Sequence, residues 1–184
     1  NRKGGFGREG SAELGRVLGW LVGDSTSTAE RAILSFSGAE GAELATAFAG
    51  VVESVVGASA DQRQRYAIGA GAVAVCDEPR VRSSRLLRLA AEHGLSVGDQ
   101  HKVPESVFRG TEAMQRGFLQ ALFTADGTVA DSIAKGASVC LTSISRALLC
   151  DVQRLLLNFG IASTLYTERR HGGLRLLPDG RGGQ

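Results

Sequence analysis

Two short segments of this chain carry a small residue at every fourth position and end in an aspartate. The segment from Leu14 to Asp24 reads LGRVLGWLVGD, and the segment from Arg116 to Asp126 reads RGFLQALFTAD. Residues four apart stack on one face of an α-helix, so each segment predicts a helix with one nearly bare side. The small residues of the two stripes, which we expect to form a close helix–helix interface, are Gly15, Gly19, Gly23, Gly117, Ala121 and Ala125.

If the two stripes meet, Asp24 and Asp126 come to lie side by side. That arrangement opposes stability, because a carboxylate at a helix C-terminus opposes the macrodipole and two neighbouring negative charges repel. Divalent cations would reverse both effects. Alternatively, each aspartate merely begins a turn, as the sequence Asp126-Gly127 would allow. Because the motif recurs in the same register 102 residues later, we favour a pair of metal-binding carboxylates.

Composition excludes several other classes of protein. A chain of 184 residues can bury one good core or two small ones, and its apolar runs are too short to span a membrane. Cys76, Cys140 and Cys150 form an odd set without metal-type spacing, and the three histidines are isolated, so neither a disulfide framework nor a zinc site is indicated. We expect a protein with no membrane partner that acts inside the cell, in the cytoplasm.

Positive charge is unevenly distributed along the chain, although the formal net charge is only +2. Arginines gather in residues 62–88 and again in 161–184, whereas the amphipathic stretch 40–56 carries glutamates and no base. A solvated surface could show this pattern by chance. Together with the acidic pair, it favours a polyanionic partner.

The order of predicted elements is repeated along the chain. Helices are predicted from Ser11 to Gly23, at 40–56 and at 84–93, with a turn or short edge strand at 25–28 and strands at 29–37, 62–76 and 79–83 between them. After a connection at 95–110, the order starts again with the second small-residue helix. It continues with a turn or strand at 128–131 and a strand at 137–143, where Val139 and Leu141 are expected to face inward. A helix capped by Ser145 then runs to 159. The last predicted strands are 161–170 and 173–177, and the offset of 102 to 107 residues indicates an internal duplication.

The two segments resemble the paired dodecapeptides of the LAGLIDADG homing endonucleases, with Asp126-Gly127 matching the family ending and Ser25 standing where the family has glycine. The resemblance implies an α+β fold of two pseudo-symmetric αββαββα repeats, packed through the paired helices beneath saddle-shaped antiparallel sheets. The expected organisation is a flexible lead-in (1–10), a first repeat (11–94), a linker (95–110) and a second repeat (111–184) without the closing helix.

The family resemblance also implies an activity and a cofactor. The chain is expected to be a monomeric enzyme that binds a long double-stranded DNA target and hydrolyses both strands with two or three Mg²⁺ ions, for which Mn²⁺ or Ca²⁺ could substitute. Asp24 and Asp126 would bind the metal together with main-chain carbonyls near Gly23 and Ala125. Two alternatives use the same scaffold: a DNA-binding protein that no longer cleaves, and an RNA maturase.

Lys102 lies in the sequence K-V-P, similar to a block that precedes the second dodecapeptide in intein-borne members of the family. The resemblance implies a catalytic role for Lys102, and it places Thr142 on a strand near the active site. Alternatively, Lys102 is a solvated lysine before a proline turn. Because Asn1 and Gln184 offer none of the residues of a protein-splicing centre, the chain resembles an endonuclease domain of an intein or a trimmed free-standing relative.

Residues expected to contact DNA are spread over both predicted sheets, where arginine can bind guanine edges or phosphates. The same polar faces could equally be ordinary solvated sheet surfaces. The candidates are Arg31, Ser35, Ser37, Arg63, Arg65, Arg80, Arg82, Lys135, Ser138, Thr142, Thr164, Tyr166, Arg169, Arg170 and Arg175.

Overall fold

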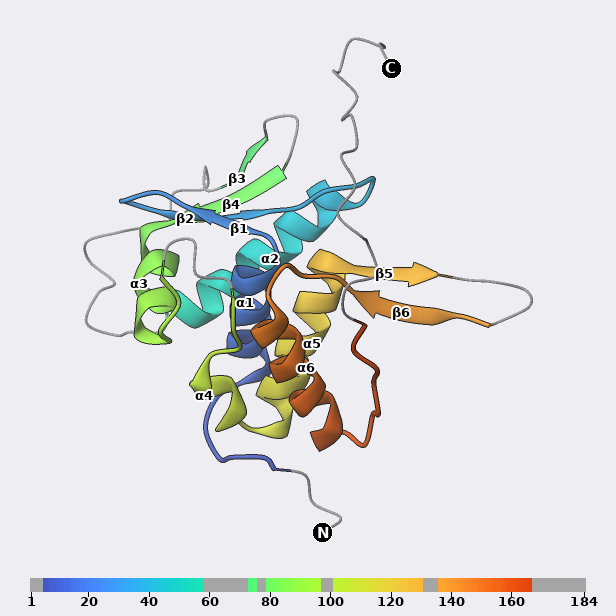
Figure 1. Ribbon diagram of the computed structural model, residues 1–184. Helices are drawn as coiled ribbons and strands as arrows, with labels where there is room; N and C mark the ends of the chain where they lie inside the picture. The colour runs from blue at the N-terminus through green and yellow to red at the C-terminus, as the bar shows by residue number, and fades with distance from the viewer. Residues whose placement is uncertain (1–4, 58–72, 76–78, 97–100, 131–135, 167–184) are drawn as a thin grey trace, which may run out of the picture.

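Two long helices side by side form the centre of the molecule, with strands across their C-terminal ends (Figure 1). The computed structural model describes residues 5–57, 73–75, 79–96, 101–130 and 136–166. The helices are α1 (Ala12–Gly23) and α5 (Glu112–Asp126). The Ser11 hydroxyl caps α1 by accepting the Leu14 N–H, and the Thr111 hydroxyl caps α5 by accepting the Met114 N–H. The predicted cap and the two predicted helices are therefore confirmed.

The first half of the chain builds a four-stranded antiparallel sheet above α1. Its strands are β1 (Ser25–Ser27), β2 (Ala32–Ser35), β3 (Val73–Val75) and β4 (Pro79–Ser83), in the order β1-β2-β4-β3. Helices α2 (Gly41–Val56) and α3 (Ser84–Glu92) lie beneath it (Figure 1). Side chains alternate along β2 as in a half-buried strand, because Ala32, Leu34 and the following Phe36 are buried while Ile33 and Ser35 are only half-buried.

Aromatic packing fixes α1 against this sheet. The Trp20 ring stacks on Phe36 with 4.5 Å between centroids and lies 4.9 Å from the Phe48 ring of α2. The Trp20 indole N–H also donates to the carbonyl oxygen of Ser35 at 2.9 Å, so its one polar group is satisfied. The last turn of α1 is thus joined to β2 by both apolar and polar contacts.

The second half repeats the order of the first as far as its second helix. After the short α4 (Glu105–Phe108), α5 is followed by the antiparallel pair β5 (Gly127–Ala130) and β6 (Ser138–Leu141), and then by α6 (Arg146–Asn158). The order α1-β1-β2-α2 therefore recurs as α5-β5-β6-α6. Leu148, Val152 and Leu155, spaced three and four residues apart, form the buried face of α6. The mixed helical and antiparallel architecture confirms the α+β class.

Two predictions for the second half were wrong. Val139 was expected to face inward, but its side chain is 64% exposed, and its cross-strand partner Val129 is 72% exposed. The reason is that β5 and β6 extend sideways past the helices that would cover them (Figure 1). The strand expected from 161 is also absent over 161–166, where the Gln153 side chain instead donates to the Ser163 carbonyl. The expected strand at 173–177 lies outside the described residues.

Residues 5–10 pack against the second half of the chain, in contrast to the flexible lead-in that we expected. Glu9 and Gly110 form a parallel bridge, and the Gly7 N–H donates to the Gly110 carbonyl at 2.8 Å. The buried Gln115 side chain also donates to the Gly5 carbonyl. These contacts give the glycine-rich segment a fixed course that its composition did not predict. In the part of the chain that the structure describes, no helix has both the length and the apolarity to cross a membrane.

Candidate functional site

The small-residue stripes of α1 and α5 face each other, and the two backbones touch. A Cβ atom added to Gly15 would lie 2.1 Å from the Met114 carbonyl oxygen, and one added to Gly19 would lie 2.3 Å from the Phe118 carbonyl oxygen. Both distances are far too short for non-bonded atoms. The bare stripes are therefore what allows this approach, and they fix the relative height of the two helices.

This close contact brings the ends of the two helices together. At the top of the stripe, a Cβ added to Gly23 would lie 2.8 Å from the Ala125 Cβ and 3.7 Å from the Asp126 Oδ2. Burial and then the negative charge of Asp24 raise the pKa of Asp126 above its ordinary value, although part of its side chain faces solvent. The two carboxyl groups therefore interact, which identifies an acidic centre at the end of the helix seam.

The two aspartates are held differently. Helix α1 ends at Gly23 and leaves Asp24 as its C-cap, whereas α5 continues through Asp126. The Ser25 hydroxyl donates to the Leu21 carbonyl at 2.6 Å, so the serine that replaces the family glycine closes the last turn of α1. At Gly127, by contrast, a Cβ would lie 2.3 Å from the Phe123 carbonyl oxygen. The α5 side therefore requires glycine, and the α1 side accommodates serine.

Each aspartate leads directly into a strand pair, in matching register. Ser25 pairs with Leu34, and the Ser35 N–H donates to the Asp24 carbonyl at 3.1 Å, which places Ser35 across from Asp24. Gly127 pairs with Leu141 in the second half, so Thr142 follows that pair as Ser35 follows the Ser25–Leu34 pair. Ser35 and Thr142 thus occupy corresponding positions beside the acidic pair.

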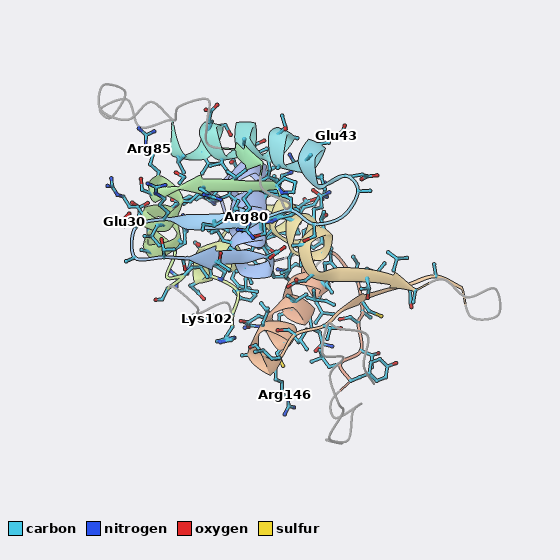
Figure 2. All side chains as sticks on the ribbon, turned by 90° about the horizontal axis from the view of Figure 1, so that it is seen from above. Glu30, Glu43, Arg80, Arg85, Lys102 and Arg146 are labelled. Atoms are coloured by element: carbon cyan, nitrogen blue, oxygen red, sulfur yellow. The ribbon has the colours of Figure 1, made fainter. Side chains whose placement is uncertain are left out.

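The first sheet presents a basic face on the side away from its core. Arg80 pairs with Ser35 and Arg82 with Ile33, so both arginines lie on the face opposite the buried Val81. Asp24, Ser35 and Arg80 therefore form one row across the sheet, and Figure 2 shows Arg80 over its middle. The Nε of Arg82 is buried and has no hydrogen-bond partner. Arg31 and Ser37 are exposed beside the two ends of β2.

The other predicted DNA-contact residues that the structure describes lie in the second half of the chain. Ser138 and Thr142 are exposed on or next to β6, and Thr164 and Tyr166 are exposed in the segment that follows α6. The structure does not bring Thr164 and Tyr166 onto a strand. Six candidates lie outside the described residues: Arg63, Arg65, Lys135, Arg169, Arg170 and Arg175.

Lys102 is exposed beside α6, and the residues on either side of it are anchored to that helix. The Ser145 hydroxyl donates to the His101 carbonyl at 2.6 Å, and the Val103 N–H donates to Asp151 Oδ2 at 3.3 Å. Figure 2 shows Lys102 at the side of the molecule near α6. Sequence reasoning identified Ser145 only as a helix cap and missed Asp151, because nothing in the sequence signals a contact between residues 48 positions apart.

The donor set of the acidic centre is small. Among the described residues, no group of three or more histidine, cysteine, aspartate and glutamate side chains is placed to hold a metal ion. The pair Asp24 and Asp126 would therefore need oxygen ligands from the main chain, water or a substrate. Oxygen ligands of this kind suit the hard cations Mg²⁺, Ca²⁺ and Mn²⁺.

Comparison with known proteins places this geometry in a family. Residues 113–178 match the family described as a LAGLIDADG-like domain. A solved structure of an I-DmoI double variant, in complex with its target DNA nicked in the coding strand and in the presence of manganese, aligns with a TM-score of 0.54 and 16% sequence identity. The alignment covers 83% of this chain and 79% of that chain. The sequence match assigns residues 113–178 to the LAGLIDADG-like domain family, and the alignment with the solved structure shows that the chain shares that protein's fold.

Curated relatives match the chain over only a small part of their own length. The alpha subunit of the ribonucleoside-diphosphate reductase NrdEB from Bacillus subtilis (strain 168) is 38% identical over 102 residues, which are 55% of this chain and 9% of that protein. A DNA gyrase subunit from Mycobacterium gordonae is 32% identical over 114 residues, which are 62% of this chain and 20% of that protein. The chain thus spans a fifth or less of these relatives.

Proposed function

We propose that this chain is a site-specific homing endonuclease that binds a long duplex DNA target and hydrolyses both strands with divalent metal ions. The observation that carries the proposal is the close pairing of Asp24 and Asp126 at the end of a backbone-to-backbone helix seam. A fold gains no stability by bringing two carboxylates together. The arrangement is explained if divalent metal ions bind between the two carboxylates.

Asp24 and Asp126 are the residues that would hold the metal, with the main-chain carbonyls near Gly23 and Ala125 as further oxygen ligands. Mg²⁺ bound there, as two or three ions, supplies an activated water and charge stabilisation for phosphodiester hydrolysis. The chain's own residues keep the two carboxylates in place. Because the stripe glycines allow no sliding of one helix past the other, the separation of the acids is fixed before DNA binds.

The strand faces beside the acids supply the proposed DNA-binding surface. The row from Asp24 through Ser35 to Arg80 has Arg82 beside it, two residues along β4 on the same face, so positive charge lies next to the negative centre. Arginine side chains in such a row can contact both phosphates and base edges of a duplex. The corresponding position on the second strand pair is Thr142. Monomeric binding follows if each strand pair covers one half of the target.

We further infer that the domain is carried inside longer host proteins, as an intein or a similar insertion. Two relatives with unrelated names, one a ribonucleotide reductase and the other a gyrase, match the same chain over about a hundred residues each. A segment shared by such different proteins, and small within each of them, is best explained as a mobile insertion. The homing activity proposed above is what such an insertion would use to spread.

Incubation of the protein with a random duplex library and Mg²⁺, followed by sequencing of cut ends, tests the proposal. Discrete cut ends are expected from the wild type, whereas Asp24→Asn and Asp126→Asn should lose double-strand cutting and keep DNA binding. Glu112→Gln is the matched control, because Glu112 is an exposed acid at the opposite end of α5. Enriched but uncut duplexes would instead identify a DNA-binding protein without cleavage. The absence of both cut ends and enriched duplexes would favour an RNA maturase.

A further inference from the structure

The segment around Lys102 is fastened to α6 at two points, one on each side of the lysine. The Ser145 hydroxyl donates to the His101 carbonyl, and the Asp151 carboxylate accepts the Val103 N–H. Ser145 and Asp151 are six residues apart on α6, which corresponds to about 9 Å along a helix. Residues 101–103 therefore run along α6 and are not merely in contact with it at one point.

The burial of the residues that follow Lys102 indicates the side on which its side chain lies, because Lys102 itself is exposed. Val103 is buried, with 4% of its surface exposed, and Pro104 is buried beside it. Lys102 is consequently held on the outer side, so its ammonium group can reach a bound polyanion.

The same anchor connects Lys102 to the Asp126 side of the acidic centre. Ser145 comes three residues after Thr142, which directly follows the Gly127–Leu141 pair, and Gly127 directly follows Asp126. Three residues span at most about 10 Å. The position of the lysine is thus set by the end of β6 and the start of α6, which are also the elements that border Asp126.

Asp151 is itself oriented by further contacts. Its Oδ1 accepts a hydrogen bond from Arg154 at 3.2 Å, and the Arg154 guanidinium lies 4.6 Å from the centroid of the Phe108 ring in α4. One carboxylate oxygen therefore bonds to the Lys102 segment, and the other bonds to a side chain that packs on the following helix. Asp151 is thus linked to the connection between the two halves of the chain in two ways, directly to Val103 and through Arg154 to Phe108.

We propose that Ser145 and Asp151 are positioning residues for the endonuclease reaction, because they hold the Lys102 segment on α6 and thereby place the ammonium group beside the scissile phosphate nearest Asp126. This inference rests on the proposed nuclease function. It assigns a role in the reaction to two α6 residues outside the metal and DNA contacts named above. Their effect on cleavage is exerted through Lys102.

The test compares two substitutions at the anchor with a control, in single-turnover cleavage of a duplex that the wild type selects from a random library. Asp151→Ala removes the acceptor and should lower the cleavage rate ten- to hundredfold while DNA binding is unchanged. Asp151→Asn keeps a carbonyl oxygen as acceptor and should restore most of the rate. Glu105→Ala is the matched control, because it removes an exposed acid that pairs with Arg109 and leaves both bonds of the anchor intact.

A double-mutant cycle with Lys102→Met separates positioning from a general structural effect. If Asp151 acts through the lysine, Asp151→Ala should cost little further rate once Lys102 is methionine. The inference would be overturned by equal losses of rate in the two backgrounds, by a wild-type rate for Asp151→Ala, or by a wild-type rate for Lys102→Met. None of these results would contradict the proposed endonuclease activity. A wild-type protein that selects and cuts no duplex would overturn both, and thermal melts of all variants exclude unfolding as the cause of a loss.

Discussion

The Ser35 N–H donates a hydrogen bond to the Asp24 carbonyl at 3.1 Å, and the Ser35 carbonyl accepts one from the Trp20 indole at 2.9 Å. Both backbone groups of one strand residue are thus bonded to the last turn of α1 and its cap. The acid that is proposed to bind metal is therefore held by the sheet as well as by its helix. Ser35 therefore links the sheet directly to the proposed metal-binding aspartate.

The glycine stripe should tolerate no added methyl group. Gly19→Ala would place a Cβ 2.3 Å from the Phe118 carbonyl oxygen, so we expect a loss of about 2–3 kcal/mol of unfolding free energy from the forced backbone shift. Gly50→Ala in α2 is the matched control, because a Cβ there meets nothing within 4 Å and alanine favours a helix interior by about 0.5–1 kcal/mol. Urea unfolding measured by circular dichroism checks both, and equal stability of the two variants would contradict a backbone-to-backbone seam.

The buried Gln115 should be essential for holding the N-terminal segment. Its side-chain nitrogen donates to the carbonyls of Gly5, Phe108 and Gly110, and its oxygen accepts from Asn158. Gln115→Leu removes all four of these hydrogen bonds from a buried position, and we expect a loss of about 2–3 kcal/mol of unfolding free energy. Gln120→Leu, at an exposed position of the same helix, should change stability little. Hydrogen exchange at Gly7 should also speed up in Gln115→Leu only, and unchanged exchange there would disprove the link.

Asp126→Asn should stabilise the metal-free protein at neutral pH while removing the proposed activity. Folding raises the pKa of Asp126 above 3.8, so this carboxyl favours the fold when protonated, and that contribution is lost as the pH rises through the folded pKa. We expect the variant to melt about 2 °C higher than the wild type at pH 7 and low salt. The difference should shrink towards pH 4 and on addition of Mg²⁺. A wild type that is more stable than the variant at pH 7 without metal would contradict the repulsion.

Arg82 should contribute to DNA affinity, and Arg88 should not. Arg82 lies on the outer face of β4, whereas Arg88 is exposed on α3, beneath the sheet. We expect Arg82→Gln to weaken duplex binding about tenfold and Arg88→Gln to change it less than about twofold. Fluorescence anisotropy at several salt concentrations measures both, and similar losses would place the duplex on another surface.

Much of the fold was predictable because it is determined by local patterns. The caps at Ser11 and Ser145 and the helix periodicities are short-range features, and all of them are present in the structure. Stripe spacing also predicted which sides of α1 and α5 meet, since only small residues allow that approach. The position of Asp24 next to Asp126 then followed from the common register of the two segments.

The parts that could not be predicted depend on contacts between distant residues. The Gln115 network joins residues 110 positions apart, and the Val103–Asp151 bond joins residues 48 positions apart. The exposure of Val139 was missed because alternation in a strand predicts two faces but not whether a helix lies beneath one of them. Lys102 could be named from its motif, but only the three-dimensional structure reveals what holds it.

The seam between α1 and α5 also constrains how such proteins can be recombined. Because the main chains of α1 and α5 are in contact, a half taken from a different relative fits only if its helix carries a stripe of small residues at the same height. Engineering that aims to change the proposed DNA target should therefore exchange the strands and keep α1 and α5 together as a pair from one protein.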